Sequence, residues 1–463
     1  MLIGRAGPER LGSYRAIVLL IAVIFGGLIG WMTYRSPRNP LELKTEDALV
    51  RMTHVRARPD IVMVALDDRS VQRYGSVQKW RRSVLADGLA RIEEQNPRWV
   101  ILDLALDGRT HTGDEALWRQ IARNRNVVLA MAYDGLRGPV YTPDDIRSLR
   151  FLERFAVANG LSAKRTAASF DWAKFEPPVS DFTQSARGVG VFDRETDTDG
   201  VVRTARMLYV TTVRYPQANA PLPGKFPIST LSDGLPVALP NIALVSALRA
   251  VDLDKQAVGV ADGESLQFLG TINPRINIPL DGQERMNTRY GGPAGRYATA
   301  SFVDLIDRKV ASDAFKGKIV LVGPTAPGDS ATEARGTPMG VMARPEITAN
   351  ALQTILDRSY FWRPEIKAVG IMLLLGLATG LLLMGASGVR QTLFALIALL
   401  AYLVLAFVFY AFGHVLLPIL PGILVVVTPY VVAQALALGP YRPVELEASP
   451  TYVPPGRIVD HPI

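Results

Sequence analysis

Pro59-Asp60-Ile61-Val62-Met63-Val64-Ala65-Leu66-Asp67-Asp68 is the stretch that predicts the fold of this chain. Its six consecutive apolar residues, three of them β-branched and none of them Gly or Pro, indicate a strand buried on both faces. Residues 98–103 (RWVILD) repeat the pattern of a strand followed by an aspartate, and a third apolar run lies at 126–131. Helical stretches at 69–74 and 83–94 separate the first two runs. We therefore expect an α/β domain with a mainly parallel sheet and crossover helices.

Four uncharged apolar runs are each long enough to cross a bilayer, because a helix rises about 1.5 Å per residue. The predicted transmembrane helices are residues 16–34, 368–387, 393–412 and 415–438. Residues 35–363 between them have the composition of a water-exposed domain. The expected architecture is one transmembrane helix, a large domain, and three further transmembrane helices.

Positive charges beside the spans predict the orientation of the chain. With four crossings, the following arginines all fall on one side: Arg5, Arg10, Arg15, Arg390 and Arg442. The positive-inside rule makes that side cytoplasmic, although Arg363 and Lys367 lie on the other side. We expect a bacterial inner-membrane protein whose N-terminal arm (1–15) and Pro-rich tail (439–463) are cytoplasmic. The domain at 35–363 would then be periplasmic.

Composition argues against several classes of site. The chain has no cysteine, so it has no disulfides, thiolate zinc sites or cysteine nucleophiles. Its four histidines do not have metal-ligand spacing, and no Ser/His/Asp set can be identified. The net charge of +8 is not gathered into a Lys/Arg cluster of the kind that binds nucleic acid. We expect no metal, no cofactor, no nucleic acid and no catalytic residues.

Aspartates follow the first two predicted strands, at Asp67, Asp68 and Asp103. Ligands of open parallel sheets bind beyond the carboxyl ends of the strands, so these carboxylates would suit a cation or a polyol-type ligand. If the two strands are neighbours about 4.8 Å apart, Asp67 and Asp103 repel one another in an empty site. In the alternative interpretation, which we favour, Asp68 caps the helix at Arg69. Asp67 and Asp103 then bind loop amides or an arginine such as Arg81.

A glycine-rich loop follows another buried strand, predicted at 318–323. Residues 323–330 (GPTAPGDS) have the glycine spacing of a phosphate loop, but Asp329 stands where the lysine is needed and would repel phosphate. We expect a fixed turn instead.

Taken together, the strand ends and this loop provide the candidate ligand-binding residues, which are Asp67, Asp68, Asp103, Arg81 and Asp329.

A β-hairpin is predicted between the apolar runs at 188–192 and 201–210, because an Asp-Gly turn joins them. The joining residues 195–200 (ETDTDG) also match half of a calcium loop. Arg206 stands where calcium needs a bidentate glutamate. We expect a plain turn there.

Small residues recur at helical spacing in two of the predicted spans. Gly26 and Gly30 lie in the first span, and Gly376 and Gly380 lie in the second. This spacing is typical of close helix packing in membranes. We expect packing within one chain, with the seam of a homo-oligomer as the alternative.

The landmarks of the domain, in their order, resemble the extracellular sensory module called the CHASE domain of type 2 (CHASE2). The matching stretches are LELKTEDALVR, PDIVMVALDDRSV, WRRSVLADGLARI, WVILDLAL, NVVLA, GVF, DTDGVVR, NTRYGGPAG, SFVDL, FKGKIVLVGPTAPGD and PEITANALQTIL. They cover nearly all of residues 41–355, and three spans after the module are also similar to that family.

The resemblance implies signal input. Family members usually continue into a cyclase, a histidine kinase or a protein kinase, whereas here a short Pro-rich tail follows the last span. We expect a membrane sensor that relays a periplasmic signal to a separate membrane or cytoplasmic output protein, through juxtamembrane helices at 41–52 and 345–356. The alternatives are a structural or scaffolding subunit of a membrane assembly and, third, a periplasmic enzyme.

Overall fold

The structure is a computed structural model of the 463-residue chain. It describes residues 8–36, 38–53, 55–108, 112–133, 140–141, 143–156, 170, 174–192, 195–212, 215–216, 226–227, 231–232, 236–251, 258–261, 265–269, 276–281, 283–364 and 366–438. The chain forms two compact units. The first, the membrane unit, comprises Met1–Arg35, Ile366–Tyr402 and Pro421–Ile463. The second, the α/β unit, comprises Ser36–Glu365 and Leu403–Leu420.

Four of the described helices are long and apolar enough to cross a membrane, as the sequence predicts. They are α1 (Pro8–Arg35), α11 (Lys367–Met384), α12 (Val389–Gly413) and α13 (Ile419–Leu438). The start of α13 was predicted four residues too early. Residues 415–418 are not helical, because Pro418 disfavours helical backbone in the residue before it. In addition, Val415 forms an isolated parallel bridge with Trp362.

The glycines of α1 and α11 allow the two helices to pack closely within the membrane unit. A Cβ atom added to Gly26 would lie 2.7 Å from the carbonyl oxygen of Met372, and one added to Gly376 would lie 2.4 Å from that of Ala22. Only glycine fits at such backbone approaches. The prediction that this spacing serves packing within one chain is confirmed.

A seven-stranded sheet forms the centre of the α/β unit, in the order β17-β1-β18-β2-β3-β5, with β6 also paired to β3. All of these strands pair in parallel except β5, which is antiparallel to β3, so the mainly parallel sheet is confirmed. Their bounds are β1 (Ile61–Leu66), β2 (Trp99–Leu102), β3 (Val127–Tyr133), β5 (Phe175–Glu176), β6 (Gly188–Val191), β17 (Ala298–Ser301) and β18 (Ile319–Pro324).

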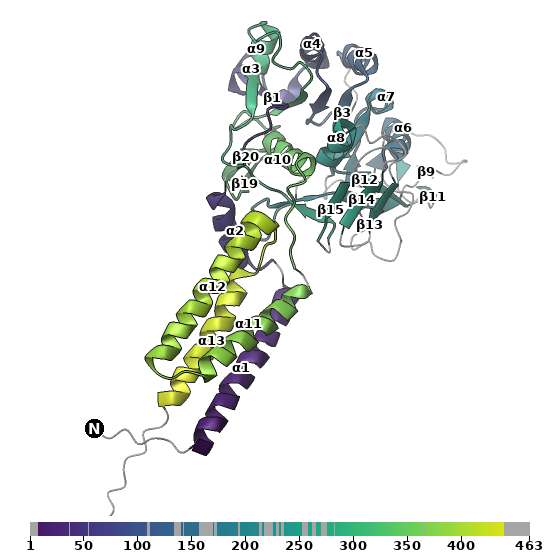
Figure 1. The fold of residues 1–463 in the computed structure, drawn as a ribbon. Coiled ribbons are helices and arrows are strands. Elements are labelled where there is room, and N and C mark those ends of the chain that lie inside the picture. Colours follow the sequence, from purple (N-terminus) through teal and green to yellow (C-terminus); the bar gives the residue numbers. More distant parts are fainter. Residues whose placement is uncertain are drawn as a thin grey trace, which may run out of the picture. The chain divides into compact units, whose positions relative to one another are not determined.

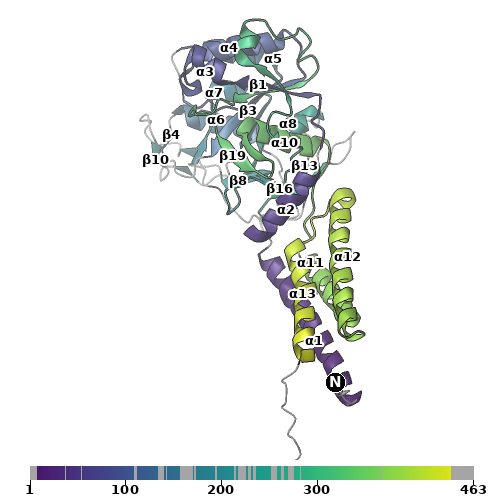
Figure 2. The ribbon, with the colours of Figure 1, turned by 90° about the vertical axis from the view of Figure 1, so that its left-hand side faces the viewer.

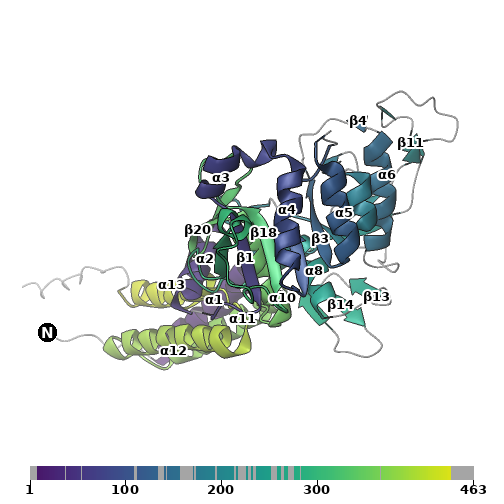
Figure 3. The ribbon, with the colours of Figure 1, turned by 90° about the horizontal axis from the view of Figure 1, so that it is seen from above.

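Alternation along each central strand directs side chains into two separate cores. In β1, Val62, Val64 and Leu66 join one core, whereas Ile61 and Met63 join the other. The first core is covered by α3 (Asp68–Tyr74), α4 (Arg82–Glu93), α5 (Asp114–Asn124), α6 (Pro143–Leu152), α7 (Ser180–Ser185) and α9 (Phe302–Ile306). The second is covered by α8 (Ile242–Ala250) and α10 (Arg344–Leu356). Figures 1, 2 and 3 show the sheet with helices on both faces.

The predicted hairpin between residues 188 and 210 is wrong in its pairing. β6 pairs with β3, whereas β7 (Thr204–Arg206) pairs with β16 (Arg285–Asn287) and β8 (Leu208–Thr212) pairs with β12 (Pro236–Pro240). A Cβ on Gly190 would lie 2.5 Å from the Cα of Ile242, so β6 is held against α8 inside the sheet. The Asp-Gly signal is local and predicts the turn, but it does not choose the partner strands. A hairpin does occur between β19 (Ala334–Thr337) and β20 (Gly340–Ala343).

Shorter elements complete the described part of the chain. They are α2 (Pro40–Met52), η1 (Val77–Lys79), η2 (Glu153–Phe155), β4 (Val140–Tyr141), β9 (Tyr215–Pro216), β10 (Phe226–Pro227), β11 (Leu231–Ser232), β13 (Val258–Ala261), β14 (Ser265–Leu269) and β15 (Ile276–Pro279).

Candidate functional site: the juxtamembrane helix and its ion pairs

The candidate residues predicted at the carboxyl edge of the sheet bind different partners and do not converge. Asp67 caps α3, accepting hydrogen bonds from the Ser70 N–H (3.0 Å) and the Ser70 hydroxyl (2.6 Å). Asp68 is the exposed first residue of that helix, so the cap lies one residue earlier than predicted. Asp329 accepts N–H bonds from Val77 and Ala331.

The arginine that binds Asp103 is Arg344, not the predicted Arg81. Arg344 Nε donates to Asp103 Oδ1 (3.1 Å), and the Thr348 hydroxyl donates to Oδ2 (2.8 Å). The side chain of Asp103 is fully buried, and the guanidinium of Arg344 lies 3.8 Å from the ring centre of Phe192. Arg81 is exposed at the start of α4. The N-terminus of α10 therefore closes the end of β2.

Asp67 and Asp103 are not on neighbouring strands, because β18 pairs with both β1 and β2 and lies between them. The expected repulsion at about 4.8 Å is therefore wrong, since the two strand ends are about twice as far apart. The sequences of β1 and β2 do not reveal that β18 pairs with β1, with Leu66 beside Pro324. Among the residues that the structure describes, no group of acidic and histidine side chains could hold a metal ion.

Replacing Asp103 by asparagine should lower the free energy of unfolding by about 1–3 kcal/mol, because Arg344 keeps its burial but loses a charged partner. Thermal or denaturant unfolding of the full chain measures this loss. Asp68→Asn is the matched control, since Asp68 is exposed in the same sheet edge region, and it should have a far smaller effect. An Asp103→Asn variant that is more stable than the wild type would instead favour a ligand site with an uncompensated charge.

A second group of charged residues surrounds α2, the helix that follows α1 along the chain. Asn39 caps α2 by accepting the N–H of Leu41, and Pro40 occupies its first position, where no amide donor is needed. The helix buries Glu42, Glu46 and Asp47 together with Leu43 and Leu49. Carboxylates are rarely buried without partners, so the partners of these three define the site.

Asp47 is bound by Arg203, whose side chain is also buried. The Nε and Nη2 atoms of Arg203 donate to the two oxygens of Asp47 at 2.7 and 2.8 Å. The remaining donors bind Asp199 (2.9 and 2.8 Å) and Asp197 (3.1 Å). All five N–H groups of the guanidinium are thus used. Arg203 holds the pKa of the Asp199 carboxyl below its usual range through these hydrogen bonds.

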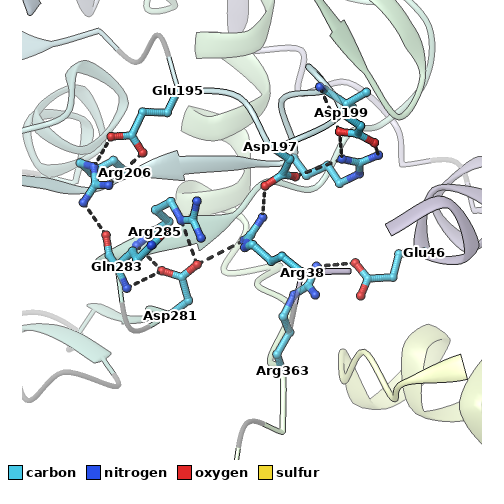
Figure 4. A network of polar contacts seen from close by, with 12 residues as sticks. Arg38, Glu46, Glu195, Asp197, Asp199, Arg206, Asp281, Gln283, Arg285 and Arg363 are labelled. Carbon is cyan, nitrogen blue, oxygen red and sulfur yellow. Dashed lines mark hydrogen bonds and ion pairs between the residues drawn. The ribbon is translucent and has the colours of Figure 1, made fainter. Parts of the chain in front are cut away.

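Arg38 lies in the segment between α1 and α2 and joins two loops of the α/β unit. Its Nη1 atom is 2.5 Å from Asp197 Oδ1, and its Nη2 atom is 3.2 Å from Asp281 Oδ2. Asp281 also accepts a bond from Arg285 Nε at 3.0 Å. Figure 4 shows Arg38 between the carboxylates of Asp197 and Asp281.

Glu46 forms an ion pair with Arg363, which lies in the segment that leads to α11 (Figure 4). Burial raises the pKa of the Glu46 carboxyl, while the charges of Arg363, Arg38 and Arg203 act in the opposite direction. The segment that precedes α11 is therefore tied to α2 by a buried ion pair.

Glu42 reaches the start of α13. Its Oε1 atom accepts the N–H of Ile419 at 2.6 Å, and its Oε2 atom accepts the N–H of Leu420 at 2.8 Å. These amides belong to the first turn of α13, where N–H groups have no partner inside the helix and where a negative charge is favoured.

Aromatic residues connect the end of α12 to the same region. Phe361 and Tyr410 stack with ring centres 5.0 Å apart, and the Tyr410 hydroxyl is 2.7 Å from that of Thr53, directly after α2. Trp362 pairs with the α12–α13 turn through an N–H bond to the carbonyl of His414 (2.9 Å). We call this set of contacts made by α2 and residues 360–363 with residues 410–420 the docking seam.

The family model of the CHASE2 domain matches residues 17–385, which is most of the sequence. The chain belongs to the CHASE2 family. CHASE2 domains are extracytoplasmic sensory domains. No curated protein and no solved structure matches.

The matched residues include α2 and Arg363 but end before α12. The partners that Glu42 finds at Ile419 and Leu420 therefore lie outside the region matched by the CHASE2 model. Within it, arginines bind the carboxylates of the acidic stretch 195–199, which matches half of a calcium loop in sequence. Arg206 binds both oxygens of Glu195, at 2.7 and 2.9 Å, and Arg203 binds Asp197 and Asp199.

The charged face of α2 was not identified as a site from the CHASE2-like sequence pattern. Its signal was nevertheless present, because Glu42, Leu43, Glu46 and Asp47 follow the helical spacing of one buried face. Acidic residues at such positions predict buried ion pairs. Their arginines, Arg203 and Arg363, lie more than 150 residues away in sequence, and no local pattern reveals them.

Proposed function

We propose that this CHASE2 protein is a sensor of the bacterial inner membrane that relays a periplasmic signal to a separate partner. The observation that carries the proposal is the set of contacts made by α2. Its buried carboxylates bind Arg363 before α11 and the first amides of α13, and the neighbouring Thr53 contacts Tyr410 of α12. A change in the domain that moves α2 would therefore act on the ends of several membrane helices.

The buried ion pairs of α2 favour positions of the helix in which every pair is intact. Separating a buried ion pair leaves an uncompensated charge, which costs several kcal/mol, so intermediate positions of α2 are disfavoured. A connection of this kind suits a switch between discrete states more than a gradual deformation. The family membership supports the sensory role, and the Lys/Arg bias beside the spans supports cytoplasmic termini.

The orientation is tested with reporter fusions. A reporter that works only in the cytoplasm should be active when fused after Ile463, because both termini are proposed to lie there. The same reporter fused after Arg363 should be inactive, and a reporter that works only in the periplasm should show the reverse pattern. Activity of the periplasmic reporter after Ile463 would contradict the proposed placement of the domain.

The relay is tested by purification of the tagged full chain in mild detergent and identification of the proteins that accompany it. A Glu46→Gln variant, which loses the ion pair with Arg363, should keep the partner bound but alter its activity. Glu94→Gln, at an exposed position, is the control. If the variant changes neither binding nor activity, a scaffolding role is favoured instead.

A further inference from the structure

Glu42 differs from the other two buried carboxylates of α2. Asp47 is paired with Arg203 and Glu46 with Arg363, whereas Glu42 forms no ion pair with any residue in the described part of the chain. The residue is only 5% exposed. Its oxygens rely on the two backbone amides at the start of α13.

The charges that face Glu42 do not compensate it. On its own helix, Glu46 lies one turn away and carries a like charge. Arg363, in the segment before α11, is the cation that acts on Glu42, but its guanidinium is already hydrogen-bonded to Glu46. The charges of Arg38 and Arg203 act on the pKa of Glu46. Residues 415–420, which include the two amide donors of Glu42, are all apolar or Pro. Glu42 is thus a desolvated acid beside a second acid.

Burial and, to a lesser extent, the like charge of Glu46 raise the pKa of Glu42 to about 7. The amides of Ile419 and Leu420 and the charge of Arg363 act against this shift but do not cancel it. A glutamate exposed to water has a pKa of about 4.3. The same side chain therefore binds a proton more tightly in the docking seam than it does outside it.

We propose that Glu42 is a proton-binding site of this sensor: the docking seam takes up a proton when α2 binds the start of α13 and releases it when they separate. This inference rests on the proposed sensory function and gives it a ligand. The sign follows from linkage. The raised pKa stabilises the docked arrangement at acidic pH, and this contribution is lost as the pH rises through about 7.

His414 limits the effect at the acidic end. Its ring lies 3.5 Å from Arg289 Nη1 and near Phe361. Burial and the charge of Arg289 lower the pKa of His414, so its protonation opposes docking once the pH falls below the ordinary histidine value of about 6.5. Docking should therefore be stronger at acidic than at alkaline pH, by on the order of a hundredfold from Glu42 alone and by less once the protonation of His414 offsets it.

Infrared titration of the full chain in lipid nanodiscs tests the site directly. The wild type should show the carbonyl band of a buried, protonated carboxyl group that disappears as the pH is raised through the neutral range. Glu42→Gln should lack this component, because the amide keeps an acceptor oxygen for α13 but cannot titrate. Glu115→Gln, at an exposed position on α5, should leave the band unchanged. An identical titration in the wild type and Glu42→Gln would overturn the proposal.

A second variant keeps the test decisive if Glu42→Gln does not fold. Glu46→Gln removes the like charge and frees Arg363, so the titration of Glu42 should move to lower pH. A titration that stays in place or moves to higher pH would count against the assignment. The outcome is separate from the proposed relay, because the infrared titration needs no partner protein, whereas the co-purification experiment does not depend on pH.

Discussion

Replacing Arg203 by alanine should lower the free energy of unfolding of the α/β unit by about 3–5 kcal/mol. The variant leaves three carboxylates, those of Asp47, Asp197 and Asp199, without the guanidinium that binds them. Arg38 still pairs with Asp197, but nothing described replaces Arg203 at Asp47, whose side chain is 8% exposed. A buried carboxylate without a partner lowers the free energy of unfolding by more than the intact ion pair adds to it.

Denaturant unfolding of the full chain in nanodiscs measures this loss. Arg119→Ala is the matched control, because Arg119 pairs with Glu115 on the exposed surface of α5 and should show no measurable change. Arg203→Lys should also be strongly destabilised, since an ammonium group cannot make the five hydrogen bonds of the guanidinium. Unchanged stability in Arg203→Ala would mean that water enters the network and replaces the arginine.

The central strands were predictable because a strand that is buried on both faces consists of consecutive apolar residues. Ile61–Leu66 and Ile319–Pro324 are apolar runs, and both became central strands of the sheet. Their order was not predictable in the same way. β18 lies between β1 and β2, although it comes more than 200 residues later in the chain. Pairing depends on the packing of whole helices against both faces, which no single run encodes.

The same limit explains the candidate site. Acidic residues at strand ends were visible as a pattern, yet Asp67 and Asp103 are each bound by a partner, one nearby and one far along the chain. Asp67 caps its own helix, a local role that the sequence pattern assigned to its neighbour Asp68, whereas Asp103 binds Arg344, which is 241 residues away. The ion pairs of α2 are equally non-local. Sequence reasoning locates the buried acids, but only the fold assigns their partners.

Replacing Gly376 by leucine should separate α1 from α11 in the membrane unit. A Cβ atom at this position would lie 2.4 Å from the carbonyl oxygen of Ala22 and 3.3 Å from the Cα of Gly26. Both neighbours are backbone atoms, which cannot rotate away as a side chain can, so the helices must move apart. Van der Waals packing drives helix association in membranes, where there is no hydrophobic force between helices, so losing close contact removes most of the attraction.

The absence of cysteine in the chain makes this separation measurable by disulfide formation. A Cβ atom at Gly27 would approach the side chain of Leu373, so a Gly27→Cys and Leu373→Cys pair should become oxidised in an otherwise unchanged chain. Adding Gly376→Leu should lower the cross-linked fraction severalfold. Gly370→Leu is the control on the same helix, because a Cβ there meets no atom within 4 Å. Equal cross-linking in both variants would show that the glycines of α11 do not set the distance to α1, and the small-residue spacing would then have to serve another surface.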